Sequence, residues 1–302
     1  MFTLGRQYRT IASRGVVKSS RQAVECSIVI PLLNQNDQWL KHCVISALQQ
    51  TTACEVIVVI SSETPQSNLE ILRSLRDSSK NLILASSESE GFPVALNAGF
   101  QTASADRVGM LMSDDWLDPR AVELCVARNA DIVSTGHTFF AADGVTPFHE
   151  IDWTPTRERY EGLQTLERKA SYLKHFLLLR KTKLQEIGGA DESLGNFPGI
   201  DDYDMIWTLL EHRATVALVA ESLYNIRDHG SGRLTLRNAQ ESIRGLERIL
   251  RKHEIGDDEA PGIIQRHSRW YGMPVNEAYR KIKASNYLPA HDEDPRVRGG
   301  SE

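Results

Sequence analysis

The feature that most constrains this chain is the alternation of short apolar runs with helical patterns between residues 25 and 112. The first run, 27–33, has the length and near-continuous apolarity of a strand buried on both faces. Asn36 or Asp37 can cap the helix that follows, whose apolar residues recur three and four positions apart. Because strands and helices that alternate in this way are joined by right-handed crossovers, we predict an α/β fold with a mostly parallel sheet.

The same two patterns predict further elements along the chain. Strands are expected at 55–60, 81–85, 107–112 and 130–134, and a helix at 93–102. Ser67 and Asp118 are expected to cap two more helices. The stretch 136–156 is rich in turn formers and aromatic residues, which predicts either a β-excursion or a mobile loop.

The chain is predicted to be helical beyond Leu234. Gly188 and Gly189 interrupt the chain before a helix that begins at Asp201. Two amphipathic stripes follow residue 234. They consist of Ile243, Leu246, Ile249 and Leu250, and of Val275, Ala278, Tyr279 and Ile282.

Composition excludes several classes of protein. The 302 residues are 41% hydrophobic and 25% charged, which is typical of a folded protein and excludes wholesale disorder. The net charge of −5 argues against nucleic acid as the main partner, because binding to phosphates depends on a basic excess. The four cysteines form no CxxC pair, which favours neither a zinc site nor a disulfide scaffold and indicates a reducing cytosol. No apolar run approaches the roughly 18 residues of a membrane span.

Two acidic groups are candidates for chemistry. Asp114 and Asp115 follow the fourth predicted strand, and ligands of open α/β sheets bind at the carboxyl ends of strands. Their oxygens suit Mn²⁺ or Mg²⁺ bound together with a diphosphate, although a polar turn before the next helix also explains them. Asp201, Asp202 and Asp204 open a helix, where capping explains acids. Mutual repulsion among three acids can also raise one pKa and create a general base.

Four segments in this order resemble the inverting glycosyltransferases of family 2, which have the GT-A fold. The segments are 26–34 (CSIVIPLLN), 90–99 (EGFPVALNAG), 111–119 (LMSDDWLDP), and 187–192 (IGGADE) leading into 199–207 (GIDDYDMIW). The resemblance extends across residues 26 to about 235. The resemblance implies a nucleotide-sugar donor, a divalent cation (Mn²⁺ or Mg²⁺) and a hydroxyl acceptor.

The resemblance also implies roles for individual residues. Asp114 and Asp115 match the metal and diphosphate motif, and Asp202 matches the general base, with Asp201 where the family often has Glu. His229 and Ser231 resemble a His/Ser element that the family has late in its sequence, which makes His229 a further candidate metal ligand. The predicted nucleotide-sugar contacts are Pro31, Leu32, Asn34, Ser61, Gly91, Asn97, Ser113 and Asp114. The predicted acceptor or sugar contacts are Trp116, Tyr203 and Trp207, and core packing is the alternative for the two tryptophans.

The sequence departs from the family pattern at several positions. Met112 stands where the metal motif usually begins with Asp, and 60–63 (ISSE) replaces the Asp pair that reads the base. Leu33 stands where an aromatic residue is frequent, and Leu96 where Arg is common. The donor nucleotide therefore stays open among UDP, GDP and dTDP.

These observations predict an inverting transferase that moves a sugar to a glycan, polysaccharide or small-molecule hydroxyl. The alternatives are a catalytically impaired GT-A-like binding protein and a nucleotidyltransferase, which would need a phosphate loop that 31–37 lacks. We expect a cytoplasmic protein without nucleic-acid partners or a membrane span. Peripheral contact with the inner membrane face and a homodimer are left open.

The resemblance, together with the composition of the two ends, divides the chain into expected regions. Residues 25–235 form the glycosyltransferase domain, with a nucleotide half at 25–115 and an acceptor half at 116–235. A helical extension follows at 236–285 and a flexible tail at 286–302. Residues 1–24 form a loosely ordered arm that lacks acids and carries Arg6, Arg9, Arg14, Lys18 and Arg21.

Overall fold

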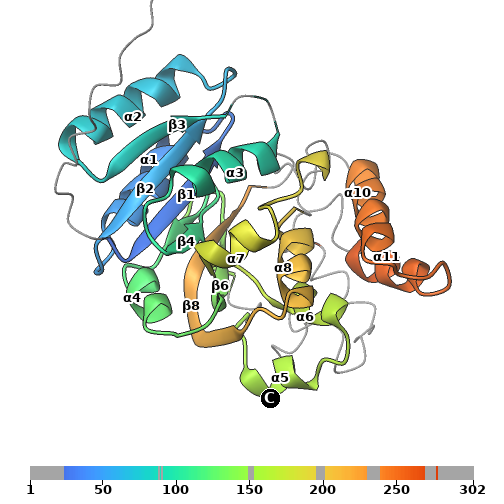
Figure 1. Cartoon of the computed structure of the whole chain (residues 1–302). Coiled ribbons are helices and arrows are strands. Elements are labelled where there is room, and N and C mark those ends of the chain that lie inside the picture. The colour runs from blue at the N-terminus through green and yellow to red at the C-terminus, as the bar shows by residue number, and fades with distance from the viewer. Residues whose placement is uncertain are drawn as a thin grey trace, which may run out of the picture.

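The computed structural model describes residues 24–87, 89, 91–148, 153–194, 201–229, 239–268 and 277. Across these residues, one sheet of eight strands has the order β3-β2-β1-β4-β7-β6-β8-β5, with helices on both faces (Figure 1). Residues 1–23 of the predicted arm, Ser231, the tail and the four apolar residues of the second predicted stripe lie outside the described residues. No described helix combines the length and the hydropathy required to cross a bilayer.

The first half of the sheet confirms the predicted alternation. β1 pairs in parallel with β2 and β4, and β2 pairs in parallel with β3. The strands are β1 (Cys26–Leu32), β2 (Cys54–Ile60), β3 (Leu82–Ser86) and β4 (Arg107–Met110). The helices between them are α1 (Asp37–Leu48), α2 (Gln66–Ser78) and α3 (Phe92–Thr102). Asn36 caps α1, since its side chain accepts from the backbone nitrogens of Gln38 and Trp39.

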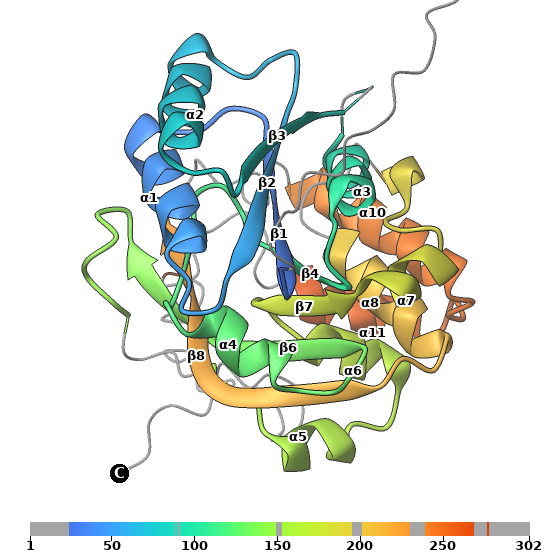
Figure 2. The ribbon, with the colours of Figure 1, turned by 60° about the vertical axis from the view of Figure 1, so that its left-hand side comes forward.

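The second half is mixed, and its long strands were not all predicted. β7 is antiparallel to β4 and β6, β6 is parallel to β8, and β8 is antiparallel to β5. The strands are β5 (Trp116–Leu117), β6 (Ile132–Ala141), β7 (Leu177–Arg180) and β8 (Val216–Asp228), the last a long curved strand in Figure 2. The chain after β6 folds back against it, with antiparallel bridges from Pro147 to Phe140 and from Trp153 to His137. The described part of 136–156 is therefore a β-excursion.

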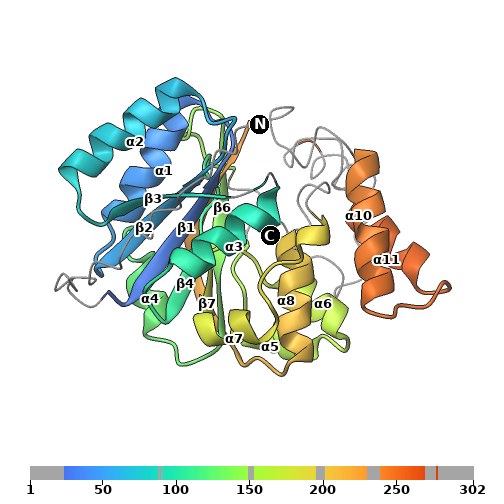
Figure 3. The ribbon, with the colours of Figure 1, turned by 45° about the horizontal axis from the view of Figure 1, so that its top comes forward.

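The helices of the second half are mostly short. They are α4 (Ala121–Val126), α5 (Arg157–Gly162), α6 (Leu166–Tyr172), α7 (Lys181–Glu186), α8 (Asp201–Glu211), α10 (Ala239–Lys252) and α11 (Ala260–Ser268), with a 3₁₀ turn η1 (Glu192–Leu194). The stripe predicted for α10 is confirmed, because Leu246, Ile249 and Leu250 are buried. α8 lies between the sheet and α10 (Figure 3).

Two predicted helix caps were wrong. Asp118 is not the N-cap of α4, which begins at Ala121. Leu117 still pairs with β8, so the chain must first turn, and Asp118 accepts from the Arg120 backbone nitrogen in that turn. Ser67 lies inside α2, and its hydroxyl donates to Asp37 instead of capping the helix.

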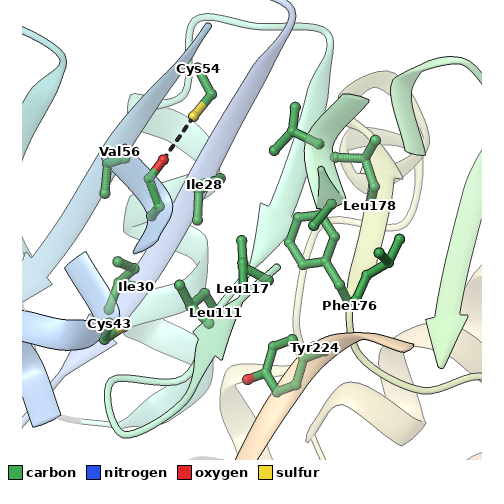
Figure 4. Close-up of a cluster of buried hydrophobic side chains, with 14 of the residues drawn as sticks. Ile28, Ile30, Cys43, Cys54, Val56, Leu111, Leu117, Phe176, Leu178 and Tyr224 are labelled. Atoms are coloured by element: carbon green, nitrogen blue, oxygen red, sulfur yellow. Dashed lines mark hydrogen bonds between the residues drawn. The ribbon is translucent and has the colours of Figure 1, made fainter. Parts of the chain in front are cut away.

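Two hydrophobic cores cover the two faces of the sheet. One packs α1, α2 and α4 against it, and the other packs α3, α8 and α10. The first core reaches the second half of the sheet, where Phe176, Leu178 and Tyr224 join it (Figure 4). Tyr224 is fully buried. It therefore has a fixed position below the loops described next.

Candidate active site

The candidate site lies at one edge of the sheet, where β4 ends and β7 begins. Because β7 is antiparallel to β4, with Leu177 opposite Met110, the residues that precede β7 lie at the carboxyl edge of β4. Asp114 and His175 therefore extend from the same edge of the sheet. The acidic start of α8 reaches this edge as well, through a hydrogen bond with His175.

Asp115 is held by protein donors. It is 5% exposed. Its Oδ2 accepts from the Tyr224 hydroxyl at 2.9 Å, and its Oδ1 accepts from the Arg227 backbone nitrogen at 2.8 Å. Buried carboxylates are tolerated when their lone pairs are satisfied in this way. This carboxylate therefore joins the turn after β4 to β8.

Asp114 has a more open environment. Its side chain is 22% exposed, and its Oδ2 lies 2.9 Å from His229 Nε2. The His229 ring packs against Trp39, with centroids 4.8 Å apart. The predicted ligands Asp114 and His229 thus lie together, whereas Asp115 faces Tyr224 and β8.

The pair fits a cation that arrives with its substrate. Among the described residues there is no group of three or more His, Cys, Asp or Glu side chains that could hold a metal. Mg²⁺ is ordinarily bound by one or two carboxylates plus substrate phosphates, rather than by an all-protein cage. Asp114 and His229 are therefore the residues that would hold Mn²⁺ or Mg²⁺, with a diphosphate supplying further oxygens.

Arg227 supports this loop from below and was not among the predicted site residues. Its side chain is 2% exposed, and its Nε donates to the Asp114 carbonyl oxygen at 3.1 Å. The guanidinium lies over Trp39 and Trp116 at 5.1 and 4.9 Å from their ring centroids. Burial lowers the Arg227 pKa, and Asp115 and Asp114 oppose that effect. A guanidinium stays charged in proteins, so Arg227 provides fixed positive charge under the two aspartates.

Asp202, the predicted general base, lies in the first turn of α8. Its side chain is 33% exposed, and its Oδ2 lies 3.1 Å from His175 Nε2. Burial alone would raise the pKa of this carboxyl. The hydrogen bond and charge of His175, with the charge of Lys174, outweigh burial and hold the pKa below its ordinary value. Asp202 is therefore a carboxylate near neutral pH, which is the form that can accept a proton.

The residues next to Asp202 face the C-terminal helices. Asp204 is 1% exposed, and its carboxylate contacts Lys252 at 2.7 Å and His253 at 3.1 Å. Trp207, 3% exposed, stacks on His253 with centroids 4.1 Å apart. Tyr203 donates to Glu167. Packing thus accounts for Tyr203 and Trp207, and their predicted contact with a sugar stays a prediction, as does any role for the side chain of Asp201.

The predicted nucleotide contacts occupy different environments. Pro31 and Leu32 are buried in β1, whereas Asn34 is exposed in the loop after it. Ser61 lies in a closed turn, where its backbone nitrogen donates to Thr64. Ser113, next to Asp114, accepts from the Gln35 side chain at 3.2 Å. Only the exposed or half-buried members of this set have side chains that can reach a ligand directly.

Asn97 has a structural contact that the sequence did not predict. Its side chain donates to the Ala190 carbonyl oxygen and accepts from the Ala190 backbone nitrogen. Gly189, at φ +85°, passes so close that a Cβ there would collide with the Asn97 amide. Asn97 thus joins α3 to the loop before α8, while Gly91 forms the N-cap of α3.

Comparisons with known proteins agree on one family. A family model described as "Glycosyl transferase family 2" matches residues 27–188, more than half of the chain. The chain is 28% identical over 277 residues to the O-antigen biosynthesis protein RfbC of Myxococcus xanthus, covering 86% of this chain and 21% of RfbC. It is 33% identical over 190 residues to the chondroitin synthase of Pasteurella multocida (strain Pm70), covering 61% of this chain and 19% of that protein. The chain thus spans about a fifth of these relatives.

Solved structures share the fold. The mannosyltransferase PcManGT from Pyrobaculum calidifontis, in complex with GDP-Man and Mn²⁺, has a TM-score of 0.57 and 15% identity, covering 90% of this chain and 81% of that chain. S. aureus TarS 1-349, in complex with UDP, has a TM-score of 0.53 and 16% identity, covering 80% of this chain and 70% of that chain. The predicted GT-A architecture is confirmed by this likeness.

Proposed function

Since this chain belongs to glycosyl transferase family 2, we propose that it transfers a sugar from a nucleoside-diphosphate donor to a hydroxyl acceptor with inversion. One observation supports the proposal above all. Two partly exposed carboxylates, Asp114 and Asp202, extend from one edge of the sheet, and each lies beside a histidine. Both also connect to Tyr224, Asp202 through His175 and Asp114 through its neighbour Asp115.

Asp114 and His229 would hold the divalent cation and, through it, the diphosphate. A bound Mn²⁺ or Mg²⁺ supplies positive charge that stabilises the leaving diphosphate. Arg227 and Tyr224 keep the Asp114-Asp115 turn rigid, so Asp114 is held in place before a donor arrives. The relatives and PcManGT support a nucleotide-sugar donor without deciding its base.

Asp202 would act as the general base. In a direct displacement, the acceptor oxygen forms a bond to the anomeric carbon while its proton passes to an Asp202 carboxylate oxygen. The bond between the anomeric carbon and the diphosphate breaks, and its electron pair leaves with the diphosphate. No enzyme nucleophile is required, and the anomeric configuration inverts.

The test is a panel of UDP-, GDP- and dTDP-linked sugars with small hydroxyl acceptors, with Mn²⁺ or Mg²⁺ and with chelator. Nucleoside diphosphate release measures turnover, and NMR of the product anomeric proton reports the configuration. We expect one donor class to be consumed in the presence of the cation, with inversion. A product with retained configuration would contradict the mechanism, and donor binding without consumption would favour the binding-protein alternative.

A further inference from the structure

His175 has the geometry of a residue that serves another residue's chemistry. It lies between α6 and β7, next to Phe176, which is fully buried in the core. Its own side chain is 16% exposed. The ring is thus carried by a rigid part of the backbone at the edge where the site is located.

Two contacts determine the orientation of the His175 ring. Its plane stacks on Tyr224, with centroids 5.2 Å apart and an interplanar angle of 30°. Its Nε2 lies 3.1 Å from Asp202 Oδ2. An ionised carboxylate has no hydrogen to donate, so the hydrogen of this bond belongs to Nε2. The other ring nitrogen, Nδ1, is buried and has no hydrogen-bond partner among the described residues.

Tyr224 connects this ring to the other half of the site. Its hydroxyl donates to Asp115 Oδ2 at 2.9 Å and accepts from the Met112 backbone nitrogen at 3.1 Å. Tyr224 therefore contacts the turn that carries Asp114 with its hydroxyl, and His175 with its ring. A single buried side chain thereby sets the position of both.

We propose that His175 is the positioning residue of the general base, holding Asp202 through an Nε2–H donor while Tyr224 fixes the ring relative to the donor site. This inference rests on the proposed role of Asp202. His175 contacts Oδ2 of Asp202, the Tyr203 backbone nitrogen donates to Oδ1 at 2.9 Å, and the exposed part of the side chain is left to meet the acceptor hydroxyl. Since a hydrogen bond from Nε2–H favours the charged form of a carboxyl group, His175 also keeps Asp202 ionised.

The first experiment compares His175→Gln with His175→Phe in steady-state kinetics. Gln can place a side-chain N–H near the position of Nε2, whereas Phe keeps the stacking on Tyr224 but has no donor. We expect His175→Phe to lower kcat by about 10- to 100-fold with an unchanged donor KM, and His175→Gln to retain most of the activity. His212→Phe is the matched control, since His212 is exposed at the far end of α8.

The pH profile separates positioning from a merely structural role. The ionisable side chains that act most strongly on Asp202 are His175 and Lys174, and Tyr224 stacks on the His175 ring. Loss of the Nε2–H donor disfavours the carboxylate, so the acidic limb of kcat/KM should move to higher pH in His175→Phe. It should stay in place in His175→Gln. A wild-type kcat and acidic limb in His175→Phe would overturn the proposal.

A measurement on the wild-type chain avoids dependence on the folding of any variant. Long-range ¹H–¹⁵N correlation of ring-labelled histidine identifies which nitrogen of His175 carries hydrogen. We expect hydrogen on Nε2, and a signal from an Nδ1–H tautomer alone would refute the proposal.

Asp202→Asn serves as the reference variant. If it transfers sugar at the full rate, the assignment of Asp202 as the base fails. An inactive Asp202→Asn together with a fully active His175→Phe rejects only the role of His175.

Discussion

The two acidic groups of this protein, Asp114-Asp115 and Asp202-Asp204, divide their carboxylates in the same way. In each group one aspartate is almost completely buried and satisfied by protein donors, namely Asp115 and Asp204. The other member is partly exposed and lies beside a single histidine. Burial thus separates a structural carboxylate from a candidate reactive one in both cases.

The two groups differ in what surrounds the buried member. Asp115 is held within the domain by β8, through Tyr224 and Arg227. Asp204 is held by α10, through Lys252 and His253. The turn that carries Asp114 is therefore anchored to the sheet, whereas the helix that carries Asp202 is anchored to the end of α10. We therefore predict that changes in α10 affect Asp202 before they affect Asp114.

The largest effect is expected from Asp202→Asn. An amide of the same shape cannot accept the proton of the acceptor hydroxyl, so transfer should fall by about 10²- to 10⁴-fold. Donor affinity and thermal stability should change little, because Asp202 is partly exposed and its proposed role concerns the acceptor. Steady-state turnover together with a melting curve checks this expectation. If Asp202→Asn transferred sugar at more than a tenth of the wild-type rate, Asp202 would no longer count as the reactive carboxylate beside the structural Asp204.

The next effect separates Asp114 from Asp115. Asp114→Asn should reduce transfer by about 10²-fold and abolish the rise in melting temperature that Mn²⁺ produces with a nucleoside diphosphate. Asp115→Asn should mainly lower the melting temperature of the free protein, because it weakens the bonds to Tyr224 and Arg227. Both are measured by thermal shift with and without the cation. An identical Mn²⁺ response in the two variants would refute the assignment.

Asp204→Asn should act on stability. The change leaves Lys252 and His253 without their buried carboxylate, and we expect a loss of about 2 kcal/mol in the free energy of unfolding. Urea denaturation followed by circular dichroism measures it. Asp202→Asn is the matched control, since the same chemical change two residues earlier affects a partly exposed carboxylate instead of a buried one. Equal stabilities of the two variants would show that burial does not separate them.

The smallest effect is expected in the pH dependence of stability from Glu167, which accepts from Tyr203 and Arg266. Burial would raise the Glu167 pKa, but the bonds and charges of His267 and Arg266 hold it below its ordinary value. The stabilisation is therefore present above about pH 4.3, the ordinary value for Glu, and is lost as pH falls through the lower pKa of the folded state. Glu167→Gln should flatten that acidic decline in urea titrations. If stability fell with decreasing pH as steeply in Glu167→Gln as in the wild type, a lowered Glu167 pKa would be contradicted.

The parallel half of the fold was predictable because its information is local. The run 27–33 and the β-branched residues of 55–60 have the pattern of buried strands, and the structure has strands there. β7 and β8 were missed, although residues 177–179 are all leucine, because their pairing partners lie far away in the sequence. The wrong cap at Asp118 also comes from a distant partner. Leu117, in β5, pairs with Tyr224 of β8, so the helix cannot begin at the next residue.

The sequence named groups of candidate site residues, and their roles stay predictions. Asp114, Asp202 and His229 could be named from motifs, but His175 and Arg227 could not. His175 precedes a strand whose direction is not evident from its own residues, and only an antiparallel β7 brings it to the edge where β4 ends. Arg227 acts from within the core, where its partners come from α1 and the turn after β4.

The amino-acid sequence alone determined the order of strands and helices in the first half and the positions of the acidic residues along the chain. These follow from periodicity and from short motifs, which involve neighbours only. The tertiary structure decided which carboxylate of each group is buried and which is exposed, because the groups that surround them are distant in sequence. Tyr224, His175 and Lys252 set the solvation and hydrogen bonding of Asp115, Asp202 and Asp204, and a carboxylate's chemistry depends on both.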